Sequence, residues 1–125
     1  MPQLIAVVDD EAALRQAIRS LLRSAGFSAE CFASAAELLR SDSVKRAACL
    51  ILDVRLPGMS GLELQQLLVA QGSRIPIVFI TAQDDAHGSL QAQALQAGAL
   101  AFLRKPFHEE DLLHALKRVV TPSTE

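Results

Sequence analysis

Residues 49–68 read CLILDVRLPGMSGLELQQLL, and this stretch sets the pattern for the whole chain. An apolar run from Cys49 to Leu52 has the length of a buried strand and stops at a carboxylate, Asp53. Pro57 and Gly58 mark a turn, and the leucines from Leu62 to Leu68 follow with helical spacing. The stretch therefore predicts a strand, a loop and a helix in succession.

The same unit recurs along the chain. The other apolar runs of strand length are Leu4 to Val8, Phe27 to Phe32, Ile75 to Ile80 and Leu100 to Leu103. The other helical segments are Leu14 to Ala25, one opening at Ser34, Asp84 to Gly98, and Leu112 to Val119. Continuous apolar runs suit strands covered on both faces, and parallel neighbours need right-handed crossovers. We therefore predict an α/β fold, a doubly wound (βα)5 sheet of five parallel strands in the flavodoxin-like order 2-1-3-4-5.

Length and composition favour one globular domain, because the chain has 125 residues, of which 50% are apolar and 21% charged. We expect this domain over residues 1–120 and a tail, or the start of a linker to an absent effector domain, over 121–125. A net charge of -2 and a pI near 5.9 argue against direct nucleic-acid binding. With no signal-peptide pattern or membrane-spanning run, we expect a cytoplasmic protein. Cys31 and Cys49 have no metal or redox spacing, so we expect buried, reduced, structural cysteines.

Polar side chains follow four of the five predicted strands. Asp9 and Asp10 end the first strand, Asp53 the third, Thr81 the fourth and Lys105 the fifth. Carboxyl ends of parallel strands share one edge, where the aspartates would repel one another unless a cation lay among them. Oxygen ligands without His or Cys favour Mg²⁺, Lys105 can balance a phosphoryl group, and ionised Asp53 can attack phosphorus. Singly these residues also suit helix caps or turns, but together they indicate a metal and phosphoryl site.

Four motifs resemble the receiver domain of bacterial two-component response regulators over residues 3 to about 120. They are Val7-Val8-Asp9-Asp10-Glu11, the run from Leu52 to Gly61, Phe79-Ile80-Thr81-Ala82 and Lys105-Pro106-Phe107. The sequence around Asp53 and the ending from Phe102 to Phe107 are similar to the FixJ-like branch. Members of that branch are N-terminal receivers of LuxR-type transcriptional regulators.

The resemblance implies phosphorelay signalling, in which Asp53 accepts a phosphoryl group from a sensor histidine kinase with Mg²⁺, or with Mn²⁺ as a substitute. It implies that Asp10, Asp53 and the backbone carbonyl of Arg55 ligate the metal, and that Asp9 helps through water. It also implies a cis peptide between Lys105 and Pro106.

The resemblance further assigns a switch. Thr81 would bond the phosphoryl oxygen, and Phe102 would swing inward, although a permanently buried core residue is the alternative for Phe102. Arg55 and Gln83 occupy the positions that tune acyl-phosphate lifetime. The segment from Asp84 to Gly98, rich in Ala and Gln, is predicted to be the least firmly held helix. We expect phosphorylation to shift residues 84–107 and to drive homodimerisation through this helix, the last strand and the last helix.

Several functions remain open at this point. The receiver could control transcription through a DNA-binding domain outside this chain, or it could stand alone and relay phosphate or bind a partner. A Mg²⁺-dependent aspartate-nucleophile phosphatase would carry a second Asp two residues after the nucleophile, where this chain has Arg55. A flavodoxin-like cofactor carrier needs a phosphate cradle after the first strand, where Asp9-Asp10-Glu11 would repel an anion. We therefore expect a phosphoacceptor that is not a turnover enzyme.

Overall fold

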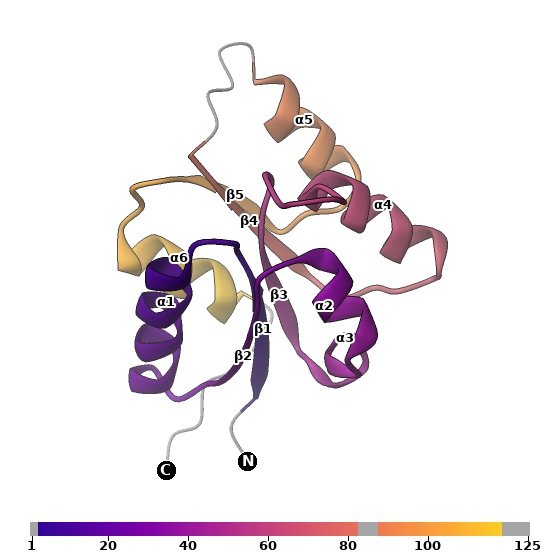
Figure 1. The fold of residues 1–125 in the computed structure, drawn as a ribbon. Coiled ribbons are helices and arrows are strands. Elements are labelled where there is room, and N and C mark those ends of the chain that lie inside the picture. Colours follow the sequence, from indigo (N-terminus) through magenta and orange to yellow (C-terminus); the bar gives the residue numbers. More distant parts are fainter. Residues whose placement is uncertain (1–2, 83–87, 119–125) are drawn as a thin grey trace.

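Five parallel strands form the centre of the fold, and helices cover both faces of the sheet (Figure 1). The computed structural model describes residues 3–82 and 88–118. The strands are β1 (Leu4–Val8), β2 (Ser28–Phe32), β3 (Cys49–Asp53), β4 (Ile77–Thr81) and β5 (Ala101–Arg104). Their order in the sheet is β2-β1-β3-β4-β5, which confirms the predicted 2-1-3-4-5 arrangement.

Six helices lie in the described part of the chain, one more than the sequence predicts. They are α1 (Ala12–Ser24), α2 (Ala35–Arg40), α3 (Ser43–Arg46), α4 (Gly61–Ala70), α5 (Ser89–Gln96) and α6 (Glu109–Lys117). Helices α1 and α6 pack on one face of the sheet, and α2, α4 and α5 pack on the other (Figure 1). The unexpected helix is α3, whose four residues are too short for any hydrophobic period to reveal it.

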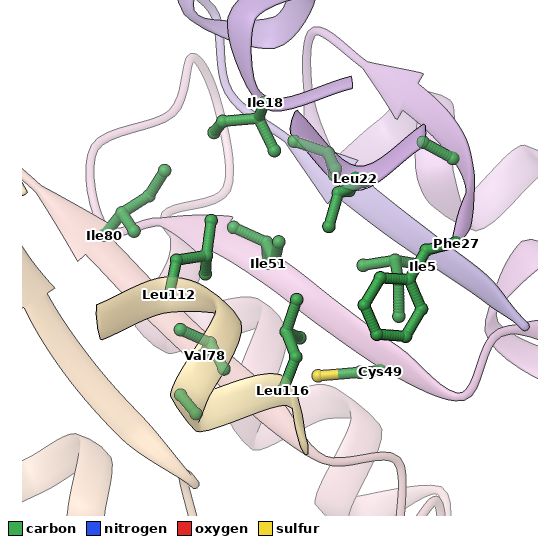
Figure 2. Close-up of a cluster of buried hydrophobic side chains, with 13 residues drawn as sticks. Ile5, Ile18, Leu22, Phe27, Cys49, Ile51, Val78, Ile80, Leu112 and Leu116 are labelled. Carbon is green, nitrogen blue, oxygen red and sulfur yellow. The ribbon is translucent and has the colours of Figure 1, made fainter. Parts of the chain in front are cut away.

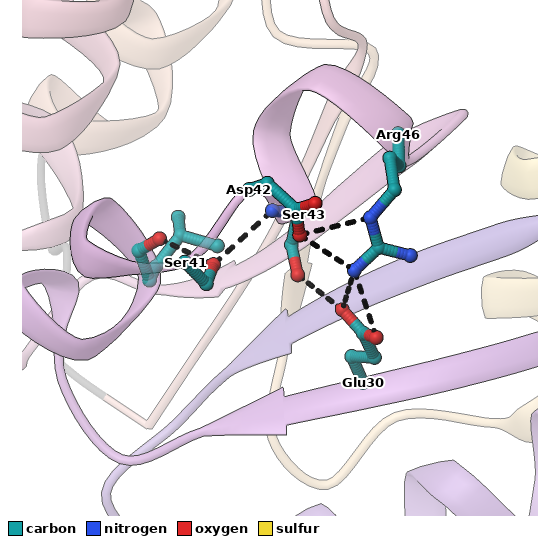
Figure 3. Close-up of polar contacts among 6 residues, drawn as sticks. Glu30, Ser41, Asp42, Ser43 and Arg46 are labelled. Carbon is teal, nitrogen blue, oxygen red and sulfur yellow. Dashed lines mark hydrogen bonds and ion pairs between the residues drawn. The ribbon is translucent and has the colours of Figure 1, made fainter.

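A polar cluster anchors α3 to β2, the strand at the edge of the sheet (Figure 3). The Arg46 guanidinium donates to both carboxylate oxygens of Glu30 at 2.8 and 2.9 Å and to Asp42 at 2.9 Å. Ser43 also donates its hydroxyl to Glu30. These hydrogen bonds, from Ser43 first and then Arg46, hold the pKa of Glu30 below its usual value. The helix is thus fixed by contacts between distant residues, which a local sequence pattern does not encode.

The face of the sheet toward α1 and α6 carries a continuous apolar core (Figure 2). Ile5, Ile51 and Val78 project from neighbouring strands, and each is fully buried. The helices contribute buried side chains to the same cluster, namely Ile18, Leu22, Leu112, Ala115 and Leu116. Burying each large aliphatic side chain contributes about 1.5–3 kcal/mol, so this layer holds α1 and α6 firmly against the sheet.

Helix α5 is held differently from its neighbours. It begins at Ser89, later than the predicted Asp84, because Gly88 has a left-handed φ of 67° that a helix does not continue through. Residues 83–87 lie outside the described residues. Only Ala94 of α5 is fully buried, and its carbonyl accepts a 3.0 Å hydrogen bond from the buried amide of Gln65 in α4.

The expectation of buried cysteines holds for Cys49 but is wrong for Cys31, which is only partly buried. Cys31 and Cys49 are free, and burial raises the pKa of the Cys49 thiol to about 12, so this thiol stays protonated. Within residues 3–82 and 88–118, no helix combines the length and apolarity needed to cross a bilayer.

Candidate phosphoryl and metal site

The carboxyl ends of the central strands meet at one edge of the sheet, where they line a pocket of about 770 Å³. The pocket brings together most of the residues expected there from the sequence. Its lining includes Asp10, Asp53, Arg55, Thr81 and Lys105. Gln83, the expected lifetime residue, lies outside the described residues.

Asp9 is fully buried, and each of its polar groups has a partner. Its backbone N–H donates to the Phe32 carbonyl at 3.1 Å, and its carbonyl accepts from the Arg15 guanidinium at 2.7 Å. One carboxylate oxygen accepts from the Glu11 N–H at 2.8 Å, and the other accepts from Lys105 Nζ at 2.9 Å. Asp9 therefore has no carboxylate oxygen without a protein donor.

Lys105 bridges two aspartates. Its Nζ donates to Asp9 Oδ2 and to Asp53 Oδ2, both at 2.9 Å, while the Asp53 Oδ1 atom accepts from the Arg55 N–H at 3.0 Å. Burial by itself lowers the pKa of Lys105, but these hydrogen bonds raise it above its usual value. Burial raises the pKa of Asp53, and this effect outweighs the opposing hydrogen bonds from Lys105 and the Arg55 N–H. The net effect of these surroundings is to favour the protonated form of the Asp53 side chain.

Asp10 is exposed, unlike the other two aspartates. Carboxylate oxygens of Asp9, Asp10 and Asp53 lie within 4.8 Å of one another. Lys105 offsets one of these three carboxylate charges, and the pocket opens on Asp10 and Asp53. A cluster of oxygen ligands with excess negative charge beside an opening fits a hard divalent cation such as Mg²⁺.

The two expected switch residues lie on the same face of the sheet. Thr81 at the end of β4 is 1% exposed and lines the pocket. Phe102 pairs with Phe79 across β4 and β5, with ring centroids 6.1 Å apart. Since Thr81 follows Phe79 by two residues, Thr81, Phe79 and Phe102 share one side of the sheet. Phe102 is partly buried and packs against the core beneath α5, outside the pocket lining.

The backbone around the site is held closely. The peptide between Lys105 and Pro106 is cis. Helix α4 begins directly against β3, because the Gly61 N–H donates to the Val54 carbonyl at 2.9 Å and a β-carbon at Gly61 would collide with the Asp53 carbonyl oxygen. Ser60 and Glu63 form a reciprocal capping box that starts this helix.

Two contacts at the site were not predicted from the sequence, namely the bridge from Lys105 to Asp9 and the hydrogen bond from Arg15 to the Asp9 carbonyl. Arg15 is one of three arginines, with Arg19 and Arg23, spaced four residues apart along α1. A single sequence gives no signal that distinguishes Arg15 from the other two.

Comparison with known proteins assigns the family. The family model described as "Response regulator receiver domain" matches residues 5–117. The response regulator protein TodT of Pseudomonas putida is 45% identical over 114 residues, covering 91% of this chain and 49% of TodT. The transcriptional regulatory protein FixJ of Bradyrhizobium diazoefficiens is 40% identical over 112 residues, covering 90% of this chain and 53% of FixJ. The chain thus spans about half the length of these curated relatives.

A solved structure agrees with this assignment. The response regulator StyR superimposes with a TM-score of 0.85 at 45% identity, covering 95% of this chain and 59% of that one. The strand order, the acidic edge and the matched residues are consistent with one another. The chain belongs to the family of receiver domains found in the response regulators of two-component systems.

Proposed function

We propose that Asp53 is the phosphoacceptor of this receiver and that its donor is the phosphohistidine of a sensor kinase. The observation that carries the proposal is the pair of hydrogen bonds from Lys105 to Asp9 and Asp53 at the mouth of an acidic pocket. The lysine supports an ionised carboxylate at position 53 despite the burial that opposes it. Asp53 acts as the nucleophile in its ionised form, which Lys105 stabilises, and an ionised aspartate needs no general base.

The transfer exchanges one bond for another. A carboxylate oxygen of Asp53 attacks phosphorus, a P–O bond forms, and the P–N bond to the donor imidazole breaks. The bonding electron pair leaves with the imidazole nitrogen. Lys105 then has a phosphoryl oxygen available as a partner in place of the Asp53 oxygen that it now binds. We propose that Thr81, which lines the pocket at the end of the adjoining strand, donates its hydroxyl to another phosphoryl oxygen.

The acidic cluster is where Mg²⁺ would be held. Asp10, Asp53 and the backbone carbonyl of Arg55 are the proposed ligands, and Mn²⁺ is an acceptable substitute. Asp9 is the proposed outer residue that acts through water, because both of its carboxylate oxygens already accept from Glu11 and Lys105. When bound, the cation neutralises charge that develops on the phosphoryl oxygens during transfer.

The response to phosphorylation is proposed to run through β4, β5 and α5. Thr81 and Phe102 lie on one side of the sheet, so a shift of Thr81 toward the phosphoryl group changes the space available to Phe102. Helix α5, which fully buries only Ala94, is the element that can follow at least cost. We assign homodimerisation to the surface of α5, β5 and α6, and acyl-phosphate lifetime to Arg55 and Gln83.

The output is proposed to be transcription, in the cytoplasm, through a DNA-binding domain outside this chain. TdiR of Thauera aromatica is named a transcriptional regulatory protein and is 40% identical to this chain over 119 residues. The chain covers 52% of TdiR, which leaves room for a second domain in such relatives. A receiver that stands alone and relays phosphate is the second candidate. In both cases the domain takes up one phosphoryl group and is not a turnover enzyme.

Intact-mass measurement after incubation with Mg²⁺ and acetyl phosphate tests the phosphoacceptor. We expect one phosphoryl adduct on the chain, none on Asp53→Asn, and none when EDTA removes the metal. Asp111→Asn is the matched control, because Asp111 is an exposed carboxylate in α6, away from the pocket lining. A phosphoryl adduct on Asp53→Asn in the same yield as on the natural chain would overturn the proposal.

A further inference from the structure

Arg15 holds the peptide group that joins the two acidic residues after β1. Arg15 lies at the end of the first turn of α1, and its guanidinium donates a hydrogen bond to the Asp9 carbonyl oxygen, 2.7 Å away. That oxygen belongs to the same planar peptide unit as the nitrogen of Asp10. A donor held on the oxygen therefore restrains the orientation of the peptide plane that contains the nitrogen and Cα of Asp10.

Asp10 depends on this plane more than Asp9 does. Asp9 is buried and anchored through its own carboxylate by Glu11 and Lys105. Asp10 is exposed, and within the described residues 3–82 and 88–118 its carboxylate forms no hydrogen bond or ion pair with the protein. No protein contact restrains the Asp10 carboxylate directly, so its reach toward the cation depends on the backbone that carries it.

We propose that Arg15 is a positioning residue for the metal site, which keeps the Asp10 carboxylate within reach of a cation shared with Asp53. The inference rests on the proposed function, since it assigns Asp10 and Asp53 to Mg²⁺. Arg15 contacts neither the cation nor the phosphoryl group in this proposal. It acts only through the peptide between Asp9 and Asp10.

The direction in which Mg²⁺ affinity changes when Arg15 is replaced distinguishes a positioning role from a purely electrostatic one. Arg15 is a cation near a site that binds a cation, so its charge alone opposes Mg²⁺ binding. Removing that charge without any loss of geometry would make Mg²⁺ bind more tightly. Removing a positioning hydrogen bond makes Mg²⁺ bind more weakly, and partners that orient metal ligands typically change affinity by about 10–100-fold.

The experiment measures Mg²⁺ binding to the unphosphorylated chain by isothermal titration calorimetry. We expect Arg15→Met to weaken binding by about tenfold and Arg15→Lys, which keeps a shorter donor, to lie between Met and the natural residue. Arg19→Met is the matched control, because it removes the same charge one turn further along α1 from an exposed side chain. We expect its affinity to stay within about twofold of the natural chain, as for an exposed charge beyond direct contact.

A second readout uses phosphorylation by acetyl phosphate. Raising the Mg²⁺ concentration should restore the rate of Arg15→Met, because Asp53 and Lys105 are untouched. Unchanged or tighter Mg²⁺ binding by Arg15→Met, or a rate that saturating Mg²⁺ does not restore, would overturn the inference. If Arg15→Met does not fold, Arg15→Lys decides by the same criteria. Absence of Mg²⁺ binding to the natural chain would instead overturn the proposed function.

Discussion

Helices α1 and α5 lie on opposite faces of the sheet and differ in how they are held (Figure 1). The 13 residues of α1 bury Ile18 and Leu22 in the core, and Arg15 ties the helix to the acidic loop. The 8 residues of α5 bury only Ala94, and Leu95 is 43% exposed. With the proposed site between a firmly held helix and a weakly held one, the proposed metal ligands can stay fixed while α5 moves. The measurements below test this division, from the largest expected effect to the smallest.

Truncation of Leu22 should cost more than truncation of Ala94. Leu22→Ala leaves a cavity in a fully buried cluster and should lower the free energy of unfolding by about 2–5 kcal/mol. Ala94→Gly removes one methyl group and weakens the helix, which together should cost about 1–2 kcal/mol. Urea denaturation measures both values. An Ala94→Gly cost equal to that of Leu22→Ala would contradict the difference between the two helices.

Phosphorylation should act on one helix and leave the other unchanged. With Mg²⁺ and acetyl phosphate, we expect amide hydrogen exchange in α5 to change by about tenfold, which corresponds to about 1.4 kcal/mol of local stability. Exchange in α1 should stay within about twofold, because its core contacts are not part of the proposed switch. Equal changes in both helices would argue against α5 as the moving element. The Asp53→Asn chain under the same conditions is the control.

The hydrogen bond between Gln65 and Ala94 should contribute to holding α5. Gln65→Met keeps the length of the side chain but removes the donor, which should cost about 1 kcal/mol. The loss should appear as faster hydrogen exchange in α5. Gln66→Met is the matched control, since Gln66 is the exposed neighbour on the same helix. Equal exchange in the two variants would show that the bond does not restrain α5.

Burial of the Asp53 carboxyl group should lower the stability of the folded chain by a smaller amount that depends on pH. Because burial raises the pKa of Asp53 above its usual 3.8, the unfolded chain ionises before the folded chain as the pH increases. The natural chain should therefore lose stability relative to Asp53→Asn above pH 3.8 and reach a constant deficit above the folded pKa. Urea midpoints measured without Mg²⁺ from pH 3 to pH 7 test this. A stability difference that stays constant, or that shifts in favour of the natural chain, between pH 3 and pH 7 would reverse the assigned direction.

Much of the fold follows from local patterns. The apolar runs locate each of the five strands to within two residues. The central strands β1, β3 and β4 are buried almost throughout and therefore need apolar side chains at nearly every position. The run from Ile75 shows where the pattern misleads. Strand β4 starts at Ile77, since Pro76 has no N–H to give to a ladder, although its carbonyl accepts from Leu50. Helix α3 escapes prediction because Glu30 and Arg46, far apart in sequence, fix it.

The sequence predicts which residues lie at the candidate site but not which hydrogen bonds they form. Strand ends show that Asp10, Asp53 and Lys105 share one edge. Lys105 donates hydrogen bonds to Asp9 as well as to Asp53. The sequence does not show this, because the partners of a lysine depend on side-chain reach and burial. The contact of Arg15 with the Asp9 carbonyl depends on how α1 packs against β1, which residue types alone do not determine.

Gly61 constrains how domains of this kind can diverge. Any side chain at this position would meet the main chain of Asp53, whatever side chain residue 53 carries. A descendant that lost the aspartate, and with it the proposed phosphorylation, would still need glycine here for α4 to pack against β3. We therefore expect the aspartate to be retained only where the signalling function is retained, and the glycine to be retained wherever the fold is.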